Sequence, residues 1–147
     1  MHKKGYVHRD IKQLNIIVVE YHYIKIIDFG LTVKCQEIRA NRHKVCVGTP
    51  RYWVPEIFTG HVHYAQKLDL CSLGVLDYSL LNFQSPFIPG KSAADFQRSK
   101  QRVLAAQYVD IAHISNQASE LIRSLLSVDP RRRPSAQELL SYYYFKI

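Results

Sequence analysis

The sequence predicts a mainly α-helical fold with one small β-hairpin near its beginning. Residues 16–19 and 23–27 are short runs of β-branched and aromatic residues with a polar turn between them, a pattern typical of two paired strands. Beyond residue 60 the apolar residues recur at helical spacing, and helix-capping signals precede two of these stretches. With 147 residues, the chain is long enough for one domain with a hydrophobic core.

Two central stretches have contrasting patterns. Residues 31–50 show no clear period, and we expect a long loop there, which in a compact domain is usually functional or disordered. A helix is expected next, buried on most sides, because its leucines form a broad apolar surface. These leucines are Leu68, Leu70, Leu73, Leu76, Leu80 and Leu81.

Three further helices are expected toward the C-terminus. One lies within residues 91–106, with Phe96 on its apolar face. Ser115 is a suitable N-cap for the next helix. Ser135 and Glu138 have the spacing of a capping box, which predicts the start of the last helix.

The composition is that of a globular protein with an excess of positive charge. The net charge is +8 and 47% of the residues are hydrophobic. A basic balance fits nucleic acid, anionic membranes or acidic substrates, but no nucleic-acid partner is expected because no basic helix or recognisable DNA- or RNA-binding module accompanies the charge. No apolar stretch is long enough to form a membrane segment.

The three cysteines predict reduced thiols rather than a metal site. Cys35, Cys46 and Cys71 are widely spaced, without a CxxC pattern. Because no signal peptide is visible, we expect an intracellular protein, cytoplasmic or nuclear.

The groups that carry chemistry lie close together near the beginning of the chain. Residues 8–15 read His-Arg-Asp-Ile-Lys-Gln-Leu-Asn, and an Asp-Phe-Gly triplet begins 18 residues after Asp10, at Asp28. The first segment carries a candidate base, Asp10, a cation, Lys12, and an amide, Asn15. Carboxylate and amide oxygens are hard ligands of the kind that Mg²⁺ requires.

The chain resembles the C-terminal lobe of a eukaryotic serine/threonine protein kinase. Five segments match that family in order, namely residues 8–15, 28–30, 48–56, 69–74 and 129–134. Together they are far more specific than any one motif. The subgroup stays open between calmodulin-dependent-like and polo-like kinases.

The resemblance implies a partial protein kinase domain over residues 1–147. Its catalytic loop is residues 8–15, its metal loop and activation segment are residues 28–56, and its helical subdomain is residues 57–147. The implied reaction transfers the γ-phosphate of Mg²⁺-ATP to serine or threonine hydroxyls of a protein substrate, largely by positioning and charge neutralisation.

The resemblance also assigns the catalytic residues. Asp10 would orient the substrate hydroxyl and accept its proton. Lys12 would stand near the γ-phosphate as a point charge, and its place two residues after Asp10 is typical of serine/threonine rather than tyrosine kinases. Thr49 would hydrogen-bond toward Asp10 and Lys12.

The cofactor-binding residues follow in the same way. Asn15 and Asp28 would hold Mg²⁺. Ile17 and its neighbours would form the floor beneath the adenine of ATP, and Lys12 would contact the phosphates.

Other matching positions are expected to have structural roles. His8 and Phe29 should pack together as part of the kinase hydrophobic spine. Asp69 should cap backbone N–H groups of the catalytic loop. Glu56 and Arg133 should form the family's buried ion pair.

The largest departure from the family is an absence. The sequence has no glycine-rich loop, no lysine-bearing strand and no helix with its partner glutamate, so the N-lobe is missing. Most of the helix that leads into the catalytic loop is absent too, and that helix normally lies in the core of the lobe. We therefore expect the isolated chain to be unstable and inactive, and to need an N-lobe or a missing upstream segment as its partner.

Regulation by phosphorylation is not expected in the activation segment. In the family, an arginine such as Arg9 often pairs with a loop phosphate. Yet no Ser, Thr or Tyr lies between Thr32 and Thr49, and the usual phosphosite four residues before Thr49 is Val45. Asp77 is a separate departure, because a carboxylate inside the central helix is costly without a partner.

Two other functions remain open. The chain fits a catalytically inactive kinase remnant or a docking or scaffold module, because half of the ATP site is missing. A basic nucleic-acid binder is the third reading, which salt-dependent binding would reveal.

Overall fold

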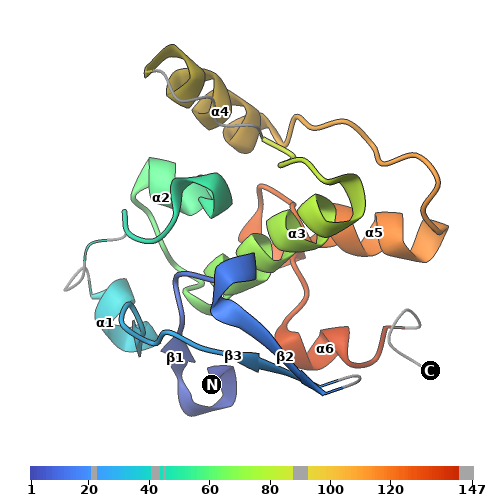
Figure 1. Ribbon diagram of the computed structural model, residues 1–147. Coiled ribbons are helices and arrows are strands. Elements are labelled where there is room, and N and C mark those ends of the chain that lie inside the picture. Colours follow the sequence, from blue (N-terminus) through green and yellow to red (C-terminus); the bar gives the residue numbers. More distant parts are fainter. Residues whose placement is uncertain (21–22, 41–43, 45, 88–92, 143–147) are drawn as a thin grey trace.

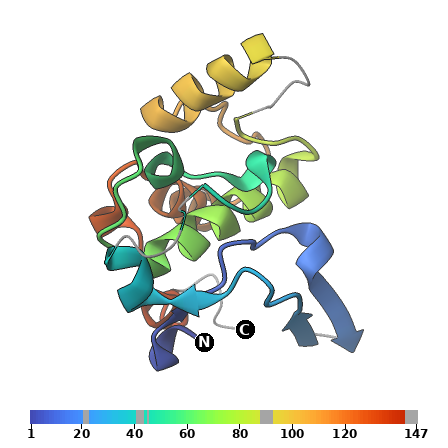
Figure 2. The ribbon, with the colours of Figure 1, turned by 90° about the vertical axis from the view of Figure 1, so that its left-hand side faces the viewer.

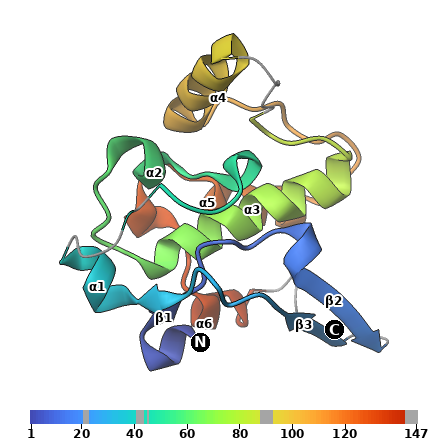
Figure 3. The same ribbon diagram turned by 60° about the vertical axis from the view of Figure 1, so that its left-hand side comes forward.

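A computed structural model describes residues 1–20, 23–40, 44, 46–87 and 93–142. Helix α3 (Gln66–Asn82) crosses the middle of the molecule. Helix α5 (Asn116–Leu125) packs along it, while α2 (Pro55–Thr59) and α4 (Ala93–Ala105) pack against each other on one side. Figure 3 shows α2 and α4 stacked on one side of α3, and the strands and α6 (Ala136–Leu139) on the other.

The predicted hairpin is confirmed. Strand β2 (Ile16–Glu20) pairs antiparallel with β3 (Tyr23–Ile26), and an irregularity between Val18 and Glu20 interrupts the register. The hairpin projects from the helical body at the lower right of Figure 2.

The expectation of a structureless loop over residues 31–50 is wrong for residues 33–39. Strand β4 (Val33–Lys34) pairs antiparallel with β1 (Tyr6–Val7), and helix α1 (Cys35–Arg39) follows it. Helix α1 buries Cys35 and Ile38 in the core. A five-residue helix is too short to display a period, and a two-residue strand is stabilised by a partner distant in sequence, so neither element has a local signal.

Helix α3 supplies much of the core, as predicted, over its first three turns. Leu68, Cys71, Val75 and Tyr78 are buried in the larger apolar cluster, and Leu70 joins a smaller cluster with α5 and α6. The expected burial ends before the last turn, because Leu80 and Leu81 are exposed. The helix C-terminus therefore lies at the surface.

The close approach of α5 to α3 depends on Gly74. A Cβ atom at this position would lie 2.7 Å from Cβ of Leu125, well inside the van der Waals contact distance. The two helices can therefore pack this tightly only with glycine there.

The expected caps of the C-terminal helices are confirmed. The Ser115 side chain accepts a hydrogen bond from the Ala118 N–H at the start of α5. Ser135 and Glu138 form the reciprocal capping box of α6. Helix α4 lies within the predicted range, although residues 91–92 fall outside the described residues, and Phe96 contacts the rings of Trp53 and Phe58.

Four short 3-10 helices complete the described structure. They are η1 (His2–Lys4), η2 (Gln13–Asn15), η3 (Pro50–Tyr52) and η4 (Pro130–Arg132). Two of them adjoin candidate site residues, since η2 ends at Asn15 and η3 follows Thr49. Among the described residues, no helix has the length and apolar character required to cross a bilayer.

Candidate active site

The carboxylate of Asp10 is held by donors from three residues. One oxygen, Oδ1, accepts from the Thr49 hydroxyl at 2.8 Å and from the Thr49 N–H at 3.0 Å. The other, Oδ2, accepts from Lys12 Nζ at 2.6 Å and from Asn15 Nδ2 at 3.1 Å. Asp10 is 7% exposed, so its orientation is fixed from both sides.

The charge state of Asp10 follows from these donors. Burial raises the pKa of the carboxyl, but the hydrogen bonds from Lys12, Thr49 and Asn15 together with the Lys12 charge outweigh it, and the net pKa is lowered. Asp10 is therefore ionised at neutral pH.

Lys12 links the catalytic loop to the activation segment. Its Nζ donates to Thr49 Oγ1 at 3.0 Å as well as to Asp10. The hydrogen bonds expected between Thr49, Asp10 and Lys12 are thus present, and the three polar groups form one cluster from segments far apart in sequence.

Asp69 fixes the backbone of the catalytic loop from the start of α3. Its two carboxylate oxygens accept the N–H groups of His8 at 2.8 Å and Arg9 at 2.9 Å, as expected. Arg9 has φ 68°, a left-handed conformation that non-glycine residues seldom adopt. His2 also contacts Asp69, with Nε2 at 2.7 Å, a contact that no sequence motif indicated.

The β2–β3 hairpin brings Asn15 and Asp28 to neighbouring positions. Asn15 immediately precedes β2, and Asp28 follows β3 by two residues; Ile16 pairs with Ile26, and the Ile27 N–H donates to Asn15 O at 2.9 Å. Two sequence segments that were separate candidates therefore meet at one end of the hairpin.

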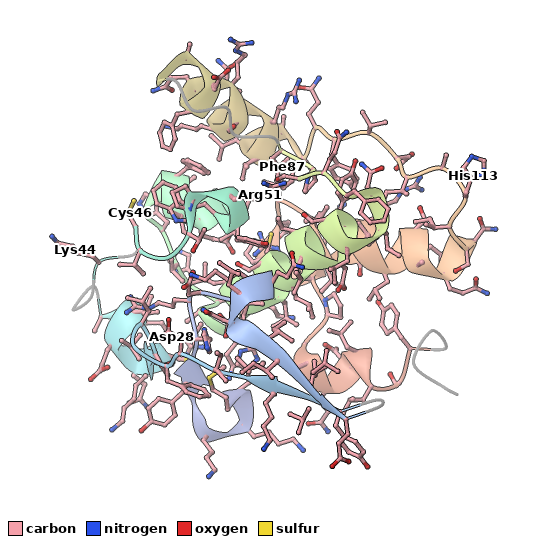
Figure 4. The ribbon with its side chains drawn as sticks, viewed as in Figure 1. Asp28, Lys44, Cys46, Arg51, Phe87 and His113 are labelled. Atoms are coloured by element: carbon pink, nitrogen blue, oxygen red, sulfur yellow. The ribbon has the colours of Figure 1, made fainter. Side chains whose placement is uncertain are left out.

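The donor chemistry of this pair fits Mg²⁺. Asn15 Nδ2 donates to both Asp10 O and Asp10 Oδ2, which leaves the Oδ1 of Asn15 as an acceptor. Asp28 is exposed, with φ 61°, and near α1 in Figure 4. Among the described residues no group of three His, Cys, Asp or Glu side chains could hold a metal ion. One carboxylate and one amide oxygen match a Mg²⁺ site completed by water and phosphate oxygens.

His8 and Phe29 pack together as expected. Their ring centroids are 5.3 Å apart, and His8 is fully buried with Nε2 3.1 Å from Ile27 O. Phe29 is 57% exposed, so this contact covers only one side of its ring. Ile17, the expected adenine floor, lies on β2 and is also exposed.

Arg9 binds the chain that follows Asp28 at two points, Leu31 and Lys44. Its Nε donates to Leu31 O at 2.7 Å, and its Nη1 donates to Lys44 O at 2.9 Å. The Arg9 guanidinium therefore donates to backbone carbonyls. In kinases, an arginine at this position often binds a phosphate on the loop instead. Val45, the position of the usual phosphosite, lies outside the described residues.

The end of the activation segment is anchored by the expected ion pair. Arg133 Nη1 lies 2.6 Å from Glu56 Oε1, and Nη2 lies 3.0 Å from Oε2. The guanidinium also donates to the carbonyls of Ser127 and Lys67. Both charges are buried, so the pair joins α2 to η4 and the start of α3.

Gly48 begins the matched segment of residues 48–56, but its packing role was not predicted from the sequence. It has φ 84°, and a Cβ there would lie 2.4 Å from Arg9 O. Only glycine fits this position without movement of the backbone. Its place directly before Thr49 is the signal that could have drawn attention to it.

The structure also has a large hollow that the sequence analysis did not predict. It has a volume of ≈ 680 Å³ and lies between η1, the hairpin, the start of α3 and α6. Its apolar lining includes Met1, Ile16, Ile26, Leu70, Leu73 and Leu140.

Comparison with known proteins gives one consistent result. A family model described as a protein kinase domain matches residues 1–145. A probable serine/threonine-protein kinase CCRP1 of Zea mays is 34% identical over 99% of this chain and 23% of its own length. The cell cycle serine/threonine-protein kinase CDC5/MSD2 of Saccharomyces cerevisiae is 35% identical over 99% of this chain and 20% of its own length. The chain thus spans about a fifth of the length of these curated relatives.

Proposed function

The chain belongs to the protein kinase family, among relatives named serine/threonine-protein kinases, and we propose that it is the catalytic C-terminal lobe of such an enzyme. It would act in phosphoryl transfer to serine or threonine hydroxyls of a protein. The observation that carries this proposal is the Asp10 carboxylate, held in place by Lys12, Thr49 and Asn15.

In the proposed reaction, Asp10 positions the substrate. Its ionised carboxylate accepts a hydrogen bond from the incoming hydroxyl and takes its proton. Because the pKa of Asp10 is lowered, it is a weak base, and its main contribution is orientation of the hydroxyl. Lys12 adds positive charge beside the carboxylate, where phosphate charge must be neutralised.

When bound, ATP would supply the phosphoryl group, and Mg²⁺ would neutralise part of the phosphate charge. Asn15 Oδ1 and the Asp28 carboxylate are the groups of this chain proposed to hold the metal, and Lys12 the phosphates. Ile17, exposed on β2, is proposed to contact the adenine. The connection of Ile27 N–H to Asn15 O keeps the two metal-binding candidates adjacent.

We propose that the activity also uses protein segments outside the 147 residues of this chain. The apolar hollow of ≈ 680 Å³ is proposed to receive an upstream helical segment, and the N-lobe is proposed to complete the ATP site. The relatives are several times longer than the match, which supports this proposal.

The location of the protein is proposed to be intracellular, cytoplasmic or nuclear. Cys35, Cys46 and Cys71 are free thiols, which suits a reducing compartment.

The alternative proposal is an inactive remnant or docking module, because the 147 residues contain no glycine-rich loop to cover the phosphates of ATP. The test compares the 147-residue chain with a completed chain, joined to the N-lobe and leading helix of the yeast relative. Isothermal titration with Mg²⁺-ATP should detect no binding by the first and clear binding by the second. A completed chain that is folded but binds no nucleotide supports the remnant.

A further inference from the structure

Arg51 is an exposed cation next to the proposed catalytic cluster. It is the middle residue of η3, two positions after Thr49, whose hydroxyl lies 2.8 Å from Asp10 Oδ1. Figure 4 places Arg51 between α2 and α3, apart from Asp28. Its side chain is exposed, and within the part of the chain that the structure describes it has no carboxylate partner.

The carboxylates of the surrounding elements are already engaged or distant. Asp69 accepts backbone N–H groups, and Glu56 pairs with Arg133. Asp95 on α4 pairs with Arg98 at 3.4 Å, and Glu37 on α1 accepts from the Lys34 N–H.

The two remaining carboxylates of these elements lie elsewhere. Asp77 lies within α3 and Glu20 at the end of β2. Within the described part of the chain Arg51 forms no ion pair, whereas Lys12 is paired with Asp10 and Arg9 donates to backbone carbonyls. Arg51 is therefore the exposed, unneutralised positive charge of this surface.

The position of Arg51 relative to a bound substrate follows from chain geometry. Arg51 is two positions after Thr49, so the Cα atoms of the two residues are at most roughly 7 Å apart. An extended peptide advances about 3.3 Å per residue. A side chain some two to four positions from the acceptor hydroxyl would therefore lie within reach of the guanidinium.

We infer that this surface selects protein substrates with acidic residues within a few positions of the accepting hydroxyl. The inference rests on the proposed function for the place of the hydroxyl, and Arg51 is the residue that determines the charge preference. Arg51 donates to Asp or Glu of the substrate, while basic flanking residues are repelled. The excess charge of the chain, +8, acts in the same direction.

The test measures peptide binding without nucleotide. Three fluorescein-labelled peptides share a central serine and carry acidic, neutral amide or basic residues on both sides. Fluorescence anisotropy with the completed chain should show the acidic peptide bound about two- to five-fold more tightly than the neutral one, as for an exposed ion pair. The difference should shrink as salt is added.

Substitution at Arg51 should change this order. The Arg51→Gln variant should bind the acidic and neutral peptides equally, and Arg51→Glu should favour the basic peptide. The matched control is Arg132→Glu, because Arg132 is also an exposed arginine in a 3-10 helix that begins with proline. It makes the same change in net charge and should keep the acidic preference.

Three results would overturn the inference. They are equal binding of the three peptides, an acidic preference that survives Arg51→Glu, and an equal loss in Arg51→Glu and Arg132→Glu. The last would indicate binding of polyanions in general, which an equally affected DNA oligonucleotide would establish.

The inference and the proposed function fail in different ways. An Arg51-dependent acidic preference, together with a completed chain that transfers no phosphate, would retain the inference and refute the kinase activity. If a completed chain transfers phosphate but shows no preference for acidic peptides, the kinase activity is retained and the inference is refuted.

Discussion

Thr49 donates its hydroxyl hydrogen to Asp10 at 2.8 Å across 39 residues of sequence. Lys12 Nζ contacts both partners. Thr49 is thereby joined directly to the loop of residues 8–15, through both Asp10 and Lys12.

Removal of the Thr49 hydroxyl should weaken this connection. Thr49→Val keeps the shape of the side chain, whereas Thr49→Ser keeps the hydroxyl. We expect Thr49→Val in the completed chain to raise the pKa of Asp10, because the ionised carboxylate loses a donor. A ¹³C NMR titration of the Asp10 carboxyl measures this, and Thr49→Ser should leave the pKa near that of the parent.

The stability effect of Thr49→Val has a definite pH dependence. The folded-state pKa of Asp10 is depressed, so its hydrogen bonds stabilise the fold above the unfolded pKa and are lost as pH falls through the folded pKa. Thr49→Val should cost about 1.5–3 kcal/mol at neutral pH and less in acid. An equal cost at both pH values would contradict the account.

The approach of Gly48 to Arg9 should be sensitive to a single methyl group. In Gly48→Ala the new Cβ would lie 2.4 Å from Arg9 O, whereas Gly60, also at positive φ, has no atom within 4 Å. Both variants carry left-handed strain of about 1–2 kcal/mol, but only Gly48→Ala has a clash. Urea denaturation of the completed chain should show the greater loss for Gly48→Ala, and equal losses would refute the packing argument.

The ion pair of Glu56 and Arg133 should be required for folding. Arg133→Met leaves Glu56 buried without its partner, at a cost of about 3–5 kcal/mol. The control is Arg131→Met, because Arg131 pairs with Asp129 at the surface, with 71% of its side chain exposed. Circular dichroism of the completed chain during urea denaturation should show a large loss for the first variant and little change for the second. Similar curves would contradict the structural role.

Asp77 should make the fold less stable as pH rises. Burial raises the pKa of its carboxyl from 3.8 to about 6, and it has no ion-pair or hydrogen-bond partner among the described residues. Between these values the folded chain keeps a proton that the unfolded chain releases, so stability falls with rising pH. The full penalty above pH 6 is on the order of 3 kcal/mol.

The matched variant for this prediction is Asp77→Asn, which has nearly the same shape and no titratable proton. Relative to the parent, it should gain stability as pH rises from about 4 to 7. Urea midpoints of the completed chain at several pH values provide the measurement. A parent and variant with parallel pH profiles would show that Asp77 is hydrated.

The isolated chain should not unfold cooperatively. The hollow of ≈ 680 Å³ leaves the apolar side chains of Met1, Ile24, Ile26 and Leu140 exposed along its wall, and that apolar area does not contribute to stability. Calorimetry of the 147-residue chain should show a broad or absent transition. A sharp transition above about 50 °C, as in ordinary small domains, would contradict this expectation.

Sequence patterns predicted the elements whose signals are local. The hairpin of residues 16–26 has β-branched runs around a turn, and the Ser135–Glu138 capping box has its own spacing. Helix α1 and strand β4 were missed, because a short element is stabilised by contacts distant in sequence, here β1 and the core.

The site shows the same division. The order of the kinase-like segments in the sequence predicted that Asp10, Lys12 and Thr49 lie in one site. The contact of His2 with Asp69 has no sequence signature, and the distance between Gly48 and Arg9 could not be predicted, because each depends on the path of two remote backbone segments. Arg51 has no carboxylate partner among the described residues, and this could be recognised only from the structure.

The decisive measurement for the proposed kinase activity is phosphate transfer by the completed chain. With Mg²⁺-ATP and a serine peptide, we expect transfer that falls at least about a hundredfold in Asp10→Asn. Transfer should persist in Glu20→Gln, because Glu20 is an exposed carboxylate at the end of β2. A folded, nucleotide-binding completed chain that transfers no phosphate, or one in which Asp10→Asn is as active as the parent, would contradict the proposed activity.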